Sequence, residues 1–206
     1  MERLTNATLK RGLRHIADSD EHLAAALETH GHPKLRQRDP GFEALLRAIV
    51  GQQLSIAAAG AIWKRLEEAI VPLTPQGLLT QGDPALRALG LSRQKIAYAK
   101  GLAGDVRLGR VDLDGLSAME DDAAVAELVK IKGIGRWSAE IYLLFALGRA
   151  DIFPVDDLAL LIATQRVKGL KKRPDRKKML KIAEAWRPWR GAAAHFLWHY
   201  YAQAKD

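Results

Sequence analysis

The sequence contains no cysteine. This absence excludes disulfide bonds, thiolate zinc sites, cysteine nucleophiles and cysteine-ligated iron–sulfur clusters in one step. The chain also lacks a long apolar run, because neither the N-terminal segment nor any later stretch resembles a signal peptide core or a membrane span. We therefore expect a protein without membrane partners that acts in the cytoplasm.

Acidic residues are fewer than basic ones. The 24 Asp and Glu residues face 32 Lys and Arg residues, which gives a net charge of +8 and a pI near 9.8. Such a balance favours a polyanionic partner, either nucleic acid or an acidic membrane surface, without deciding between them. With 206 residues that are 48% hydrophobic, the chain is long enough to bury a substantial core.

Strand-type alternation of apolar and polar residues is scarce, whereas apolar residues recur at helical spacing along most of the chain. The pattern predicts an all-α fold. Asp83 before Pro84, and Ser92 before "RQKIAYAK", are expected helix starts, and short turns are expected over 72–91. The predicted longer helices are 5–17, 20–29, 41–53, 55–70, 92–106, 121–131, 136–147, 157–167, 175–187 and 190–203.

The stretch "LVKIKGIGRW" places Gly133 and Gly135 two residues apart between apolar helical segments. Glycines there let the backbone turn sharply and approach another molecule closely, so its N–H groups can bind a phosphate. Lys130, Lys132 and Arg136 add positive charge. The simpler alternative is a glycine-containing connection between two packed helices.

The wider segment "LVKIKGIGRWSAEIYLLFAL" resembles the helix-hairpin-helix element of DNA-binding and DNA-repair proteins. The resemblance implies that a K⁺ or Na⁺ ion is held by the backbone carbonyls of Ile131 and Gly133 against a DNA phosphate, with no other cofactor required. It also implies that the DNA backbone contacts Lys132, Gly133, Ile134, Gly135 and Arg136.

Asp156 and Asp157 stand at the predicted start of the helix "LALLIATQRV". Taken alone, the pair is typical of helix capping. In this chain it follows the hairpin, Gly148 and Pro154, and this succession resembles the helix-hairpin-helix, Gly/Pro-rich, aspartate signature of base-excision DNA glycosylases. The resemblance implies that Asp157 is the catalytic aspartate, and we expect Asp156 to cap or orient the turn.

A carboxylate suits the chemistry of such an enzyme. Cleavage of the bond between a base and deoxyribose develops positive charge on the sugar, and a pre-placed anion stabilises that state. The carboxylate can also orient or deprotonate the attacking water. The bifunctional relatives carry a lysine nucleophile just after the hairpin, where this chain has Trp137, so we expect hydrolysis that leaves an abasic site.

Aromatic residues make up only 6% of the chain, yet several lie in "WRPWRGAAAHFLWHYY" near the C-terminus. This segment resembles the "W-x-P-W/Y-R-S-x-A" ending of the 3-methyladenine DNA glycosylase II family, with Gly191 where serine is usual. "LLRAIVGQQLSIAAAGAIW" extends the resemblance over most of the chain. It implies a base pocket of Trp137 and Trp198, where an indole face attracts a cationic alkylated purine; taken alone, either tryptophan fits ordinary core packing.

The base pocket departs from some relatives at Ile141, which stands where they carry an aromatic ring. The neighbouring Tyr142 is therefore included in the predicted pocket. A target base must leave the duplex before its sugar can be attacked, and a wedge fills the gap. By resemblance, the loop "GQQLS" supplies this wedge through Gln53, with Leu54 as its neighbour; a polar turn at a helix end is the equal alternative.

Two other patterns are read more simply. The basic run over 166–181 is expected to be a solvated surface that can contact phosphates. His195 and His199 have a spacing that could bind zinc, but with no evident third ligand they are expected to serve packing or surface roles.

Together these features predict a two-lobed, all-α DNA glycosylase fold in which residues 1–206 form one catalytic unit. The central lobe is expected over 36–150, and the terminal lobe over 1–35 with 151–206. The predicted function is monofunctional excision of alkylated purines of the 3-methyladenine and 7-methylguanine type from double-stranded DNA by a monomer, associated with the nucleoid if the source is bacterial. The alternatives are a non-catalytic DNA-binding module and a glycosylase for uracil or mismatched bases.

Overall fold

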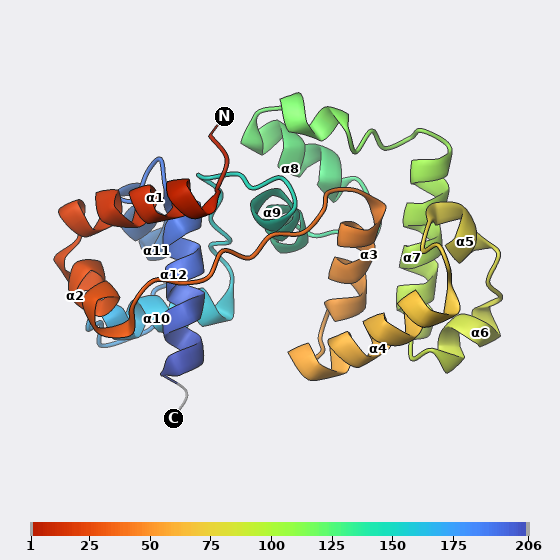
Figure 1. The fold of residues 1–206 in the computed structure, drawn as a ribbon, viewed down its shortest axis with the longest axis horizontal. Helices are drawn as coiled ribbons and strands as arrows, with labels where there is room; N and C mark the ends of the chain where they lie inside the picture. The colour runs from red at the N-terminus through yellow and green to blue at the C-terminus, as the bar shows by residue number, and fades with distance from the viewer. Residues whose placement is uncertain (1, 205–206) are drawn as a thin grey trace. The chain divides into compact units, whose positions relative to one another are not determined.

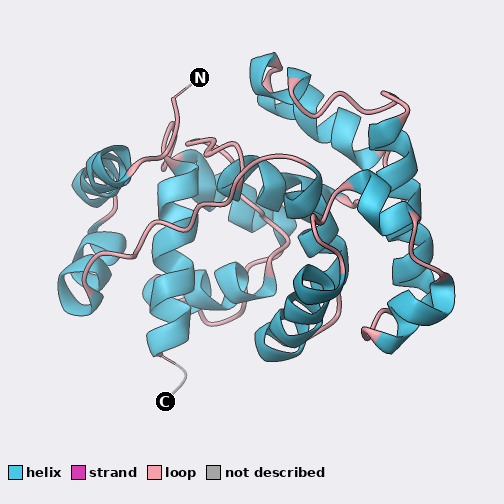
Figure 2. Cartoon of the chain, turned by 45° about the vertical axis from the view of Figure 1, so that its right-hand side comes forward, coloured by secondary structure: helices cyan, strands magenta, loops and turns pink. Residues whose placement is uncertain are grey.

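The computed structural model describes residues 2–204, apart from the side chain of Ile56. Within this range the chain forms helices joined by loops, and the only β-type pairing is one isolated bridge between Arg3 and Arg149 (Figure 2). The all-α prediction is confirmed. The helices are α1 (Asn6–Ser19), α2 (Glu21–His30), α3 (Phe42–Gly51), α4 (Ile56–Ala69), α5 (Pro75–Leu79), α6 (Asp83–Ala88), α7 (Arg93–Arg107), the 3₁₀ helix η1 (Gly115–Ala118), α8 (Asp121–Val129), α9 (Arg136–Phe145), α10 (Leu158–Val167), α11 (Arg176–Glu184) and α12 (Arg190–Gln203).

The chain divides into two compact units. Unit 1 comprises Met1–Gln37 and Leu143–Asp206, and unit 2 comprises Arg38–Tyr142. The second boundary lies earlier than the predicted end of the central lobe at residue 150. The reason is local pairing: residues 148–150 bond to the N-terminal segment, with Leu4 N–H donating to the Gly148 carbonyl (2.6 Å).

Unit 1 is built around α12. This helix packs against α1, α2 and α10, and the four are drawn in red, orange, cyan and blue in Figure 1. Trp186 and Phe196, both in unit 1, are among the largest fully buried side chains of the described residues. Gly12 of α1 allows a close approach, because a Cβ there would lie 2.8 Å from the Trp189 ring.

Unit 2 is organised by α7, which packs against α3, α5 and α6, while α3 also packs against α4 (Figure 1). Leu45, Leu46 and Ile49 on α3 are fully buried, as is Leu102 on α7. These residues follow helical spacing on each element, so the apolar periodicity that predicted the helices also forms the core.

The region 72–91 corrects one prediction. Instead of turns alone it contains the short helices α5 and α6. Thr74 caps α5 by accepting a hydrogen bond from Gly77 N–H (3.1 Å), and Pro75 follows at the first helical position. Helices of five and six residues are too short to produce a clear apolar period.

Other helix boundaries follow from capping. Ser92 caps α7 as predicted, accepting from Lys95 N–H (3.3 Å), and α6 begins at Asp83 as predicted, although its cap position is Gly82. Helix α3 ends at Gly51 rather than 53, because Gln52 leaves the helical conformation with ψ 132°. No helix in the described part of the chain is both long and apolar enough to cross a membrane.

Candidate functional site

Asp157 lies at the N-terminus of α10 in unit 1. Its Oδ1 accepts hydrogen bonds from Leu160 N–H (3.1 Å) and from the indole Nε1–H of Trp198 on α12 (3.1 Å). The first bond is a helix N-cap, an interaction that contributes about 1 kcal/mol. The second joins α10 to α12. Two donors of fixed direction therefore hold a half-buried carboxylate at the positive end of a helix.

Asp156 does not cap the helix, and this part of the prediction is wrong. A turn closed by Asp157 N–H on the Pro154 carbonyl (3.0 Å) brings Asp157 to the cap position. Asp156 is exposed and forms an ion pair with Arg176 of α11. The two adjacent carboxylates therefore have different environments. The capping role that the sequence suggested for Asp156 belongs to Asp157.

The Trp198 ring belongs to an aromatic group in unit 1. Its centroid lies 5.4 Å from that of Phe145, with the planes tilted by 36°. The His195 ring meets Phe145 edge-on at 5.4 Å. Phe145 was not predicted, because it ends the apolar run "IYLLF", which is indistinguishable from core sequence. The prediction for Trp198 thus gains a concrete setting beside the Asp157 carboxylate.

His195 is buried, and its Nδ1 lies 2.8 Å from the Gly191 carbonyl oxygen. Burial lowers the pKa of this imidazole, against the smaller opposing effect of its backbone hydrogen bonds. A neutral ring that donates Nδ1–H to a carbonyl is a packing element. No group of three or more His, Asp or Glu side chains able to hold a metal ion occurs among residues 2–204.

The hairpin between α8 and α9 lies in unit 2. Ile131 and Ile134 are buried and anchor it, with Ile134 N–H donating to the Ile131 carbonyl (2.9 Å). Gly133 has φ 94°, and a Cβ on it would lie 2.5 Å from the Tyr98 ring. Gly135 is exposed, with open space where its Cβ would be. The glycine pattern therefore has two different causes, tight packing at Gly133 and access at Gly135.

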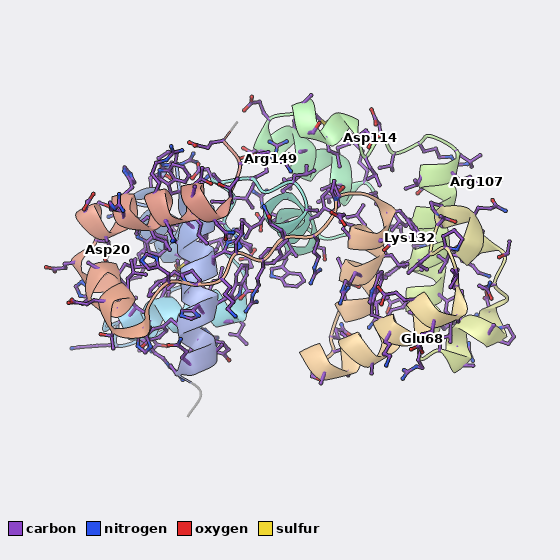
Figure 3. All side chains as sticks on the ribbon, viewed as in Figure 1. Asp20, Glu68, Arg107, Asp114, Lys132 and Arg149 are labelled. Carbon is purple, nitrogen blue, oxygen red and sulfur yellow. The ribbon has the colours of Figure 1, made fainter. Side chains whose placement is uncertain are left out.

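Charge at the hairpin is distributed unevenly. Arg136 Nε donates to Glu140 Oε1 (2.8 Å), and its guanidinium also lies 3.7 Å from Asp122. Lys130 forms an ion pair with Glu127. Lys132, labelled in Figure 3, is exposed and makes no ion pair within the described residues. Lys132 is consequently the cation of this hairpin that is most available to an anion.

The predicted cation site can be tested by donor chemistry. The Ile131 carbonyl accepts from Ile134 N–H, and the Gly133 carbonyl accepts from the Gln52 side-chain amide (2.7 Å). Each carbonyl oxygen has two lone pairs, so one remains on each for a hard monovalent cation. Neutral carbonyl oxygens fit K⁺ or Na⁺, and the ion stays a prediction.

The predicted wedge residues lie in the loop between α3 and α4. Gln53 is exposed and has φ 58°, the one non-glycine residue with a positive φ in the described part of the chain. Leu54 is 40% exposed. Both side chains are therefore available to a partner. Their neighbour Gln52 is instead bonded to the hairpin.

Trp137 and Tyr142 both lie on α9 but differ in exposure. Trp137 is 41% exposed. Tyr142 is buried, and its hydroxyl accepts a hydrogen bond from Gly41 N–H (3.0 Å) at the start of α3. Burial raises the pKa of this hydroxyl. The contact gives Tyr142 a structural task in unit 2, so it is not part of the pocket proposed below.

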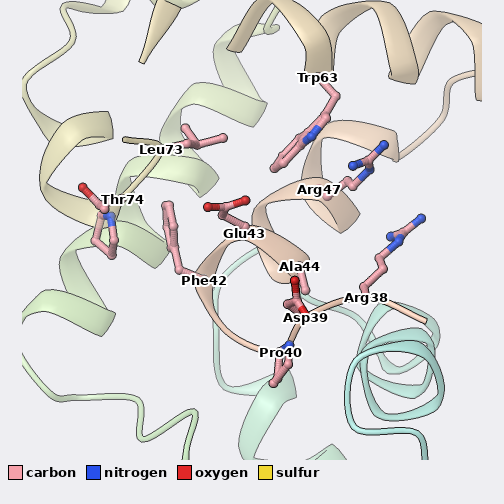
Figure 4. A pocket seen from close by; sticks show the side chains of 11 residues that line it. Arg38, Asp39, Pro40, Phe42, Glu43, Ala44, Arg47, Trp63, Leu73 and Thr74 are labelled. Atoms are coloured by element: carbon pink, nitrogen blue, oxygen red, sulfur yellow. The ribbon is translucent and has the colours of Figure 1, made fainter. Parts of the chain in front are cut away.

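A separate cavity of about 470 Å³ lies in unit 2 near the start of α3 (Figure 4). Arg38 and Arg47 flank it together with Glu43, and Arg47 lies over the Trp63 ring with 4.9 Å to the centroid. Acidic and basic groups are mixed there, and none of the predicted site residues lines it. The cavity is therefore not a candidate for the predicted chemistry.

Comparison with known proteins agrees with this set of elements. Residues 46–188 match the family model described as "HhH-GPD superfamily base excision DNA repair protein". This range includes the loop predicted to supply the wedge, the hairpin and Asp157. It covers more than half of the chain, and the chain belongs to this superfamily of helix-hairpin-helix DNA repair proteins.

Within this superfamily, the chain is similar to several 3-methyladenine DNA glycosylases. The chain is 31% identical over 193 residues to DNA-3-methyladenine glycosylase 1 of Schizosaccharomyces pombe, covering 89% of this chain and 84% of that protein. The structure of the S. pombe 3-methyladenine DNA glycosylase in complex with abasic DNA superposes with a TM-score of 0.84 at 30% identity, over 91% of this chain and 95% of that one. A DNA-3-methyladenine glycosidase from Bacillus halodurans gives 0.80 at 35% identity, over 91% and 87%.

Proposed function

We propose that this protein is a monofunctional DNA glycosylase that hydrolyses the N-glycosidic bond of alkylated purines in duplex DNA. The observation that carries the proposal is the Asp157 carboxylate, held at the start of α10 by Leu160 N–H and Trp198 Nε1–H. The similarity to 3-methyladenine DNA glycosylases from yeast and Bacillus supports the substrate class.

The proposed chemistry begins with a base rotated out of the duplex, because its sugar is not reachable inside the stack. As the bond to the base lengthens, the deoxyribose acquires positive charge. The Asp157 anion stabilises that charge and orients the water that attacks the sugar. Water adds to the anomeric carbon, the bond to the base breaks, and the proton lost by water is taken up by the carboxylate.

The preference for alkylated purines follows from charge. Methylation at N3 or N7 makes the purine cationic, and a cation is attracted to the electron-rich face of an indole. The Trp198 ring supplies such a face, supported by Phe145. For Trp137, on α9 of unit 2, a contact with the base stays a prediction. A cationic base is also a better leaving group, so modest discrimination by the protein suffices.

The absence of a lysine nucleophile at position 137 supports hydrolysis rather than strand cleavage. A Schiff-base enzyme needs an amine that attacks the sugar, and an indole cannot provide one. Incubation with lesion-containing duplex and borohydride is therefore expected to trap no covalent complex. A trapped complex would contradict the monofunctional part of the proposal.

The decisive assay measures release of free 3-methyladenine and 7-methylguanine from methylated duplex DNA. We expect release by the wild type and release slower by about a thousandfold or more by Asp157→Asn, which should still bind the duplex. Asp156→Asn removes the adjacent negative charge and serves as the matched control, with release close to wild type.

Three results would overturn the proposal. Equal release by wild type and Asp157→Asn would exclude the proposed catalytic residue. Salt-sensitive duplex binding without release of any base would identify a non-catalytic DNA-binding module. Release of uracil or a mismatched base instead of a methylated purine would keep the chemistry and change the substrate.

A further inference from the structure

The loop that carries Gln53 and Leu54 is held from behind by a lysine. Lys95, near the start of α7, donates from Nζ to the carbonyl oxygens of Val50 and Gln52, both at 2.7 Å. Val50 is in the last turn of α3, where carbonyl groups lack helical partners. The ammonium therefore caps the C-terminus of α3 and fixes the first residue of the loop.

The same loop is tied to the hairpin. The side-chain amide of Gln52 donates to the Gly133 carbonyl (2.7 Å). On α7, one turn beyond Lys95, the Tyr98 ring packs so closely on Gly133 that a Cβ there would lie at 2.5 Å. Helix α7 thus contacts both the loop over 52–55 and the hairpin over 131–135, and Gln52 joins the two directly.

These contacts explain the backbone of Gln53. A non-glycine residue with φ 58° is in a disfavoured conformation that persists only where its surroundings enforce it. The preceding residue has its carbonyl bound by Lys95 and its side chain bound by Gly133. These contacts restrict the backbone conformation of Gln53, whose side chain is exposed.

We propose that Lys95, acting with Gln52, is a positioning residue that locks the DNA wedge to the phosphate-binding hairpin, so that both engage the duplex as one rigid part. This inference rests on the proposed function, because it assigns the loop to a gap in DNA. Lys95 does not touch the reacting atoms. Its ammonium is half-buried, and burial lowers its pKa, in keeping with a group directed at the protein interior rather than at phosphate.

The test compares lysine variants on the same helix. Lys95→Met removes the donors but keeps the length of the side chain, and Lys95→Arg retains donors. Lys100→Met is the matched control: Lys100 is also on α7, carries the same charge, and pairs with Asp83 away from the loop. Gln52→Leu removes the link to Gly133 at similar volume. Thermal unfolding of every variant reports whether it is folded at the assay temperature.

Two readouts separate positioning from stability and from chemistry. The first is the fluorescence of 2-aminopurine placed beside a stable abasic-site analogue, which reports unstacking by the wedge and needs no catalysis. The second is single-turnover release of 7-methylguanine at saturating protein. For Lys95→Met we expect duplex affinity within about twofold of wild type, and unstacking and release reduced about tenfold or more.

Gln52→Leu is expected to give a smaller loss of the same kind, Lys95→Arg to restore most of the effect, and Lys100→Met to match wild type. The proposal is overturned if Lys95→Met unstacks DNA normally, if it loses only duplex affinity, or if Lys100→Met is equally impaired. If Lys95→Met does not fold, normal unstacking by Gln52→Leu overturns it. Failure of the wild type to release any methylated base would instead defeat the proposed function, while the unstacking readout still decides the positioning.

Discussion

Two carboxylates of unit 1, Asp20 and Asp157, are built in the same way. Each caps a helix, with Asp20 accepting from Leu23 N–H (3.2 Å) and Asp157 from Leu160 N–H (3.1 Å). Each also accepts an indole N–H, from Trp186 (2.9 Å) or Trp198 (3.1 Å). The two kinds of donor that these carboxylates share therefore do not decide what each carboxylate does.

The two sites differ in burial. Asp20, labelled in Figure 3 at the turn between α1 and α2, is 7% exposed and binds the Lys168 ammonium with both oxygens at 2.9 Å. Asp157 is half-buried and lies next to an aromatic group. A carboxylate enclosed in the interior mainly stabilises the fold, whereas a more exposed one can also stabilise positive charge on a ligand.

The largest expected effect separates the two aspartates by activity. Asp157→Asn keeps the cap and the shape but removes the charge, so single-turnover release of 7-methylguanine should fall about a thousandfold or more. The midpoint of thermal unfolding should stay close to wild type, because asparagine caps as well as aspartate. Asp20→Asn, assayed well below its unfolding temperature, should retain the wild-type rate; a comparable loss there would break the comparison.

The reverse experiment measures stability. Asp20→Ala leaves the Lys168 ammonium and the Trp186 N–H without their acceptor in a buried site, which should lower the free energy of unfolding by about 3 kcal/mol. Asp157→Ala removes the cap and the acceptor of the Trp198 N–H in a less buried site, so it should cost less, about 1 to 2 kcal/mol. Chemical denaturation of both variants checks the order, and equal costs would show that burial does not distinguish the two sites.

The indole donors sharpen the comparison further. Trp198→Phe keeps a ring beside Phe145 but removes the N–H that orients Asp157, so base release should fall about tenfold with little change in stability. Trp186→Phe should instead lower stability by about 1 to 3 kcal/mol and leave the rate unchanged. Rates and denaturation midpoints measured on both variants would contradict this assignment if the two effects were exchanged.

The smallest expected effect is on pH dependence. Burial by itself would raise the pKa of Asp20, but the hydrogen bonds from Trp186, Lys168 and Leu23 outweigh it, so the pKa lies below its ordinary value of 3.8. A lowered carboxyl pKa gives stability that is present above pH 3.8 and is lost as the pH falls below it. Thermal unfolding of wild type and Asp20→Asn between pH 7 and 3 should therefore converge at the acid end.

His195 adds an acid-sensitive contribution in a higher window. Its pKa is lowered from 6.5 by burial, so the unfolded chain takes up a proton below pH 6.5 that the folded chain does not. Stability from this group is complete above pH 6.5 and decreases below it. His195→Gln should flatten the profile between pH 6.5 and 5, and an unchanged slope would show that folding does not shift the pKa of this imidazole.

The helical fold was largely predictable because apolar spacing and capping are local signals. Ser92 and the start of α7 show this directly. The assignment of capping between Asp156 and Asp157 was not predictable, since it depends on the turn closed on the Pro154 carbonyl. Adjacent aspartates look alike in sequence, and one residue of register decides which oxygen reaches the helix.

Contacts between residues distant in the sequence could not be predicted. Lys95 and the Val50 carbonyl are 45 residues apart, and Gln52 and the Gly133 carbonyl are 81 apart. Backbone carbonyls exist at every position, so they leave no mark in the sequence. Phe145 was missed for another reason. An aromatic residue beside the proposed site follows the same helical spacing of apolar residues as one in the core.

The division of the chain has a consequence for its synthesis. Unit 2 is one continuous stretch, Arg38–Tyr142, whereas unit 1 joins the two ends of the chain. The Arg3 side chain donates a hydrogen bond to the Leu147 carbonyl, 144 residues away. The N-terminal segment can therefore reach its partners in unit 1 only after most of the protein has been translated. Unit 2 is complete earlier and can fold on the ribosome before unit 1 does. Asp157 can accept the Trp198 N–H only after α12 has emerged.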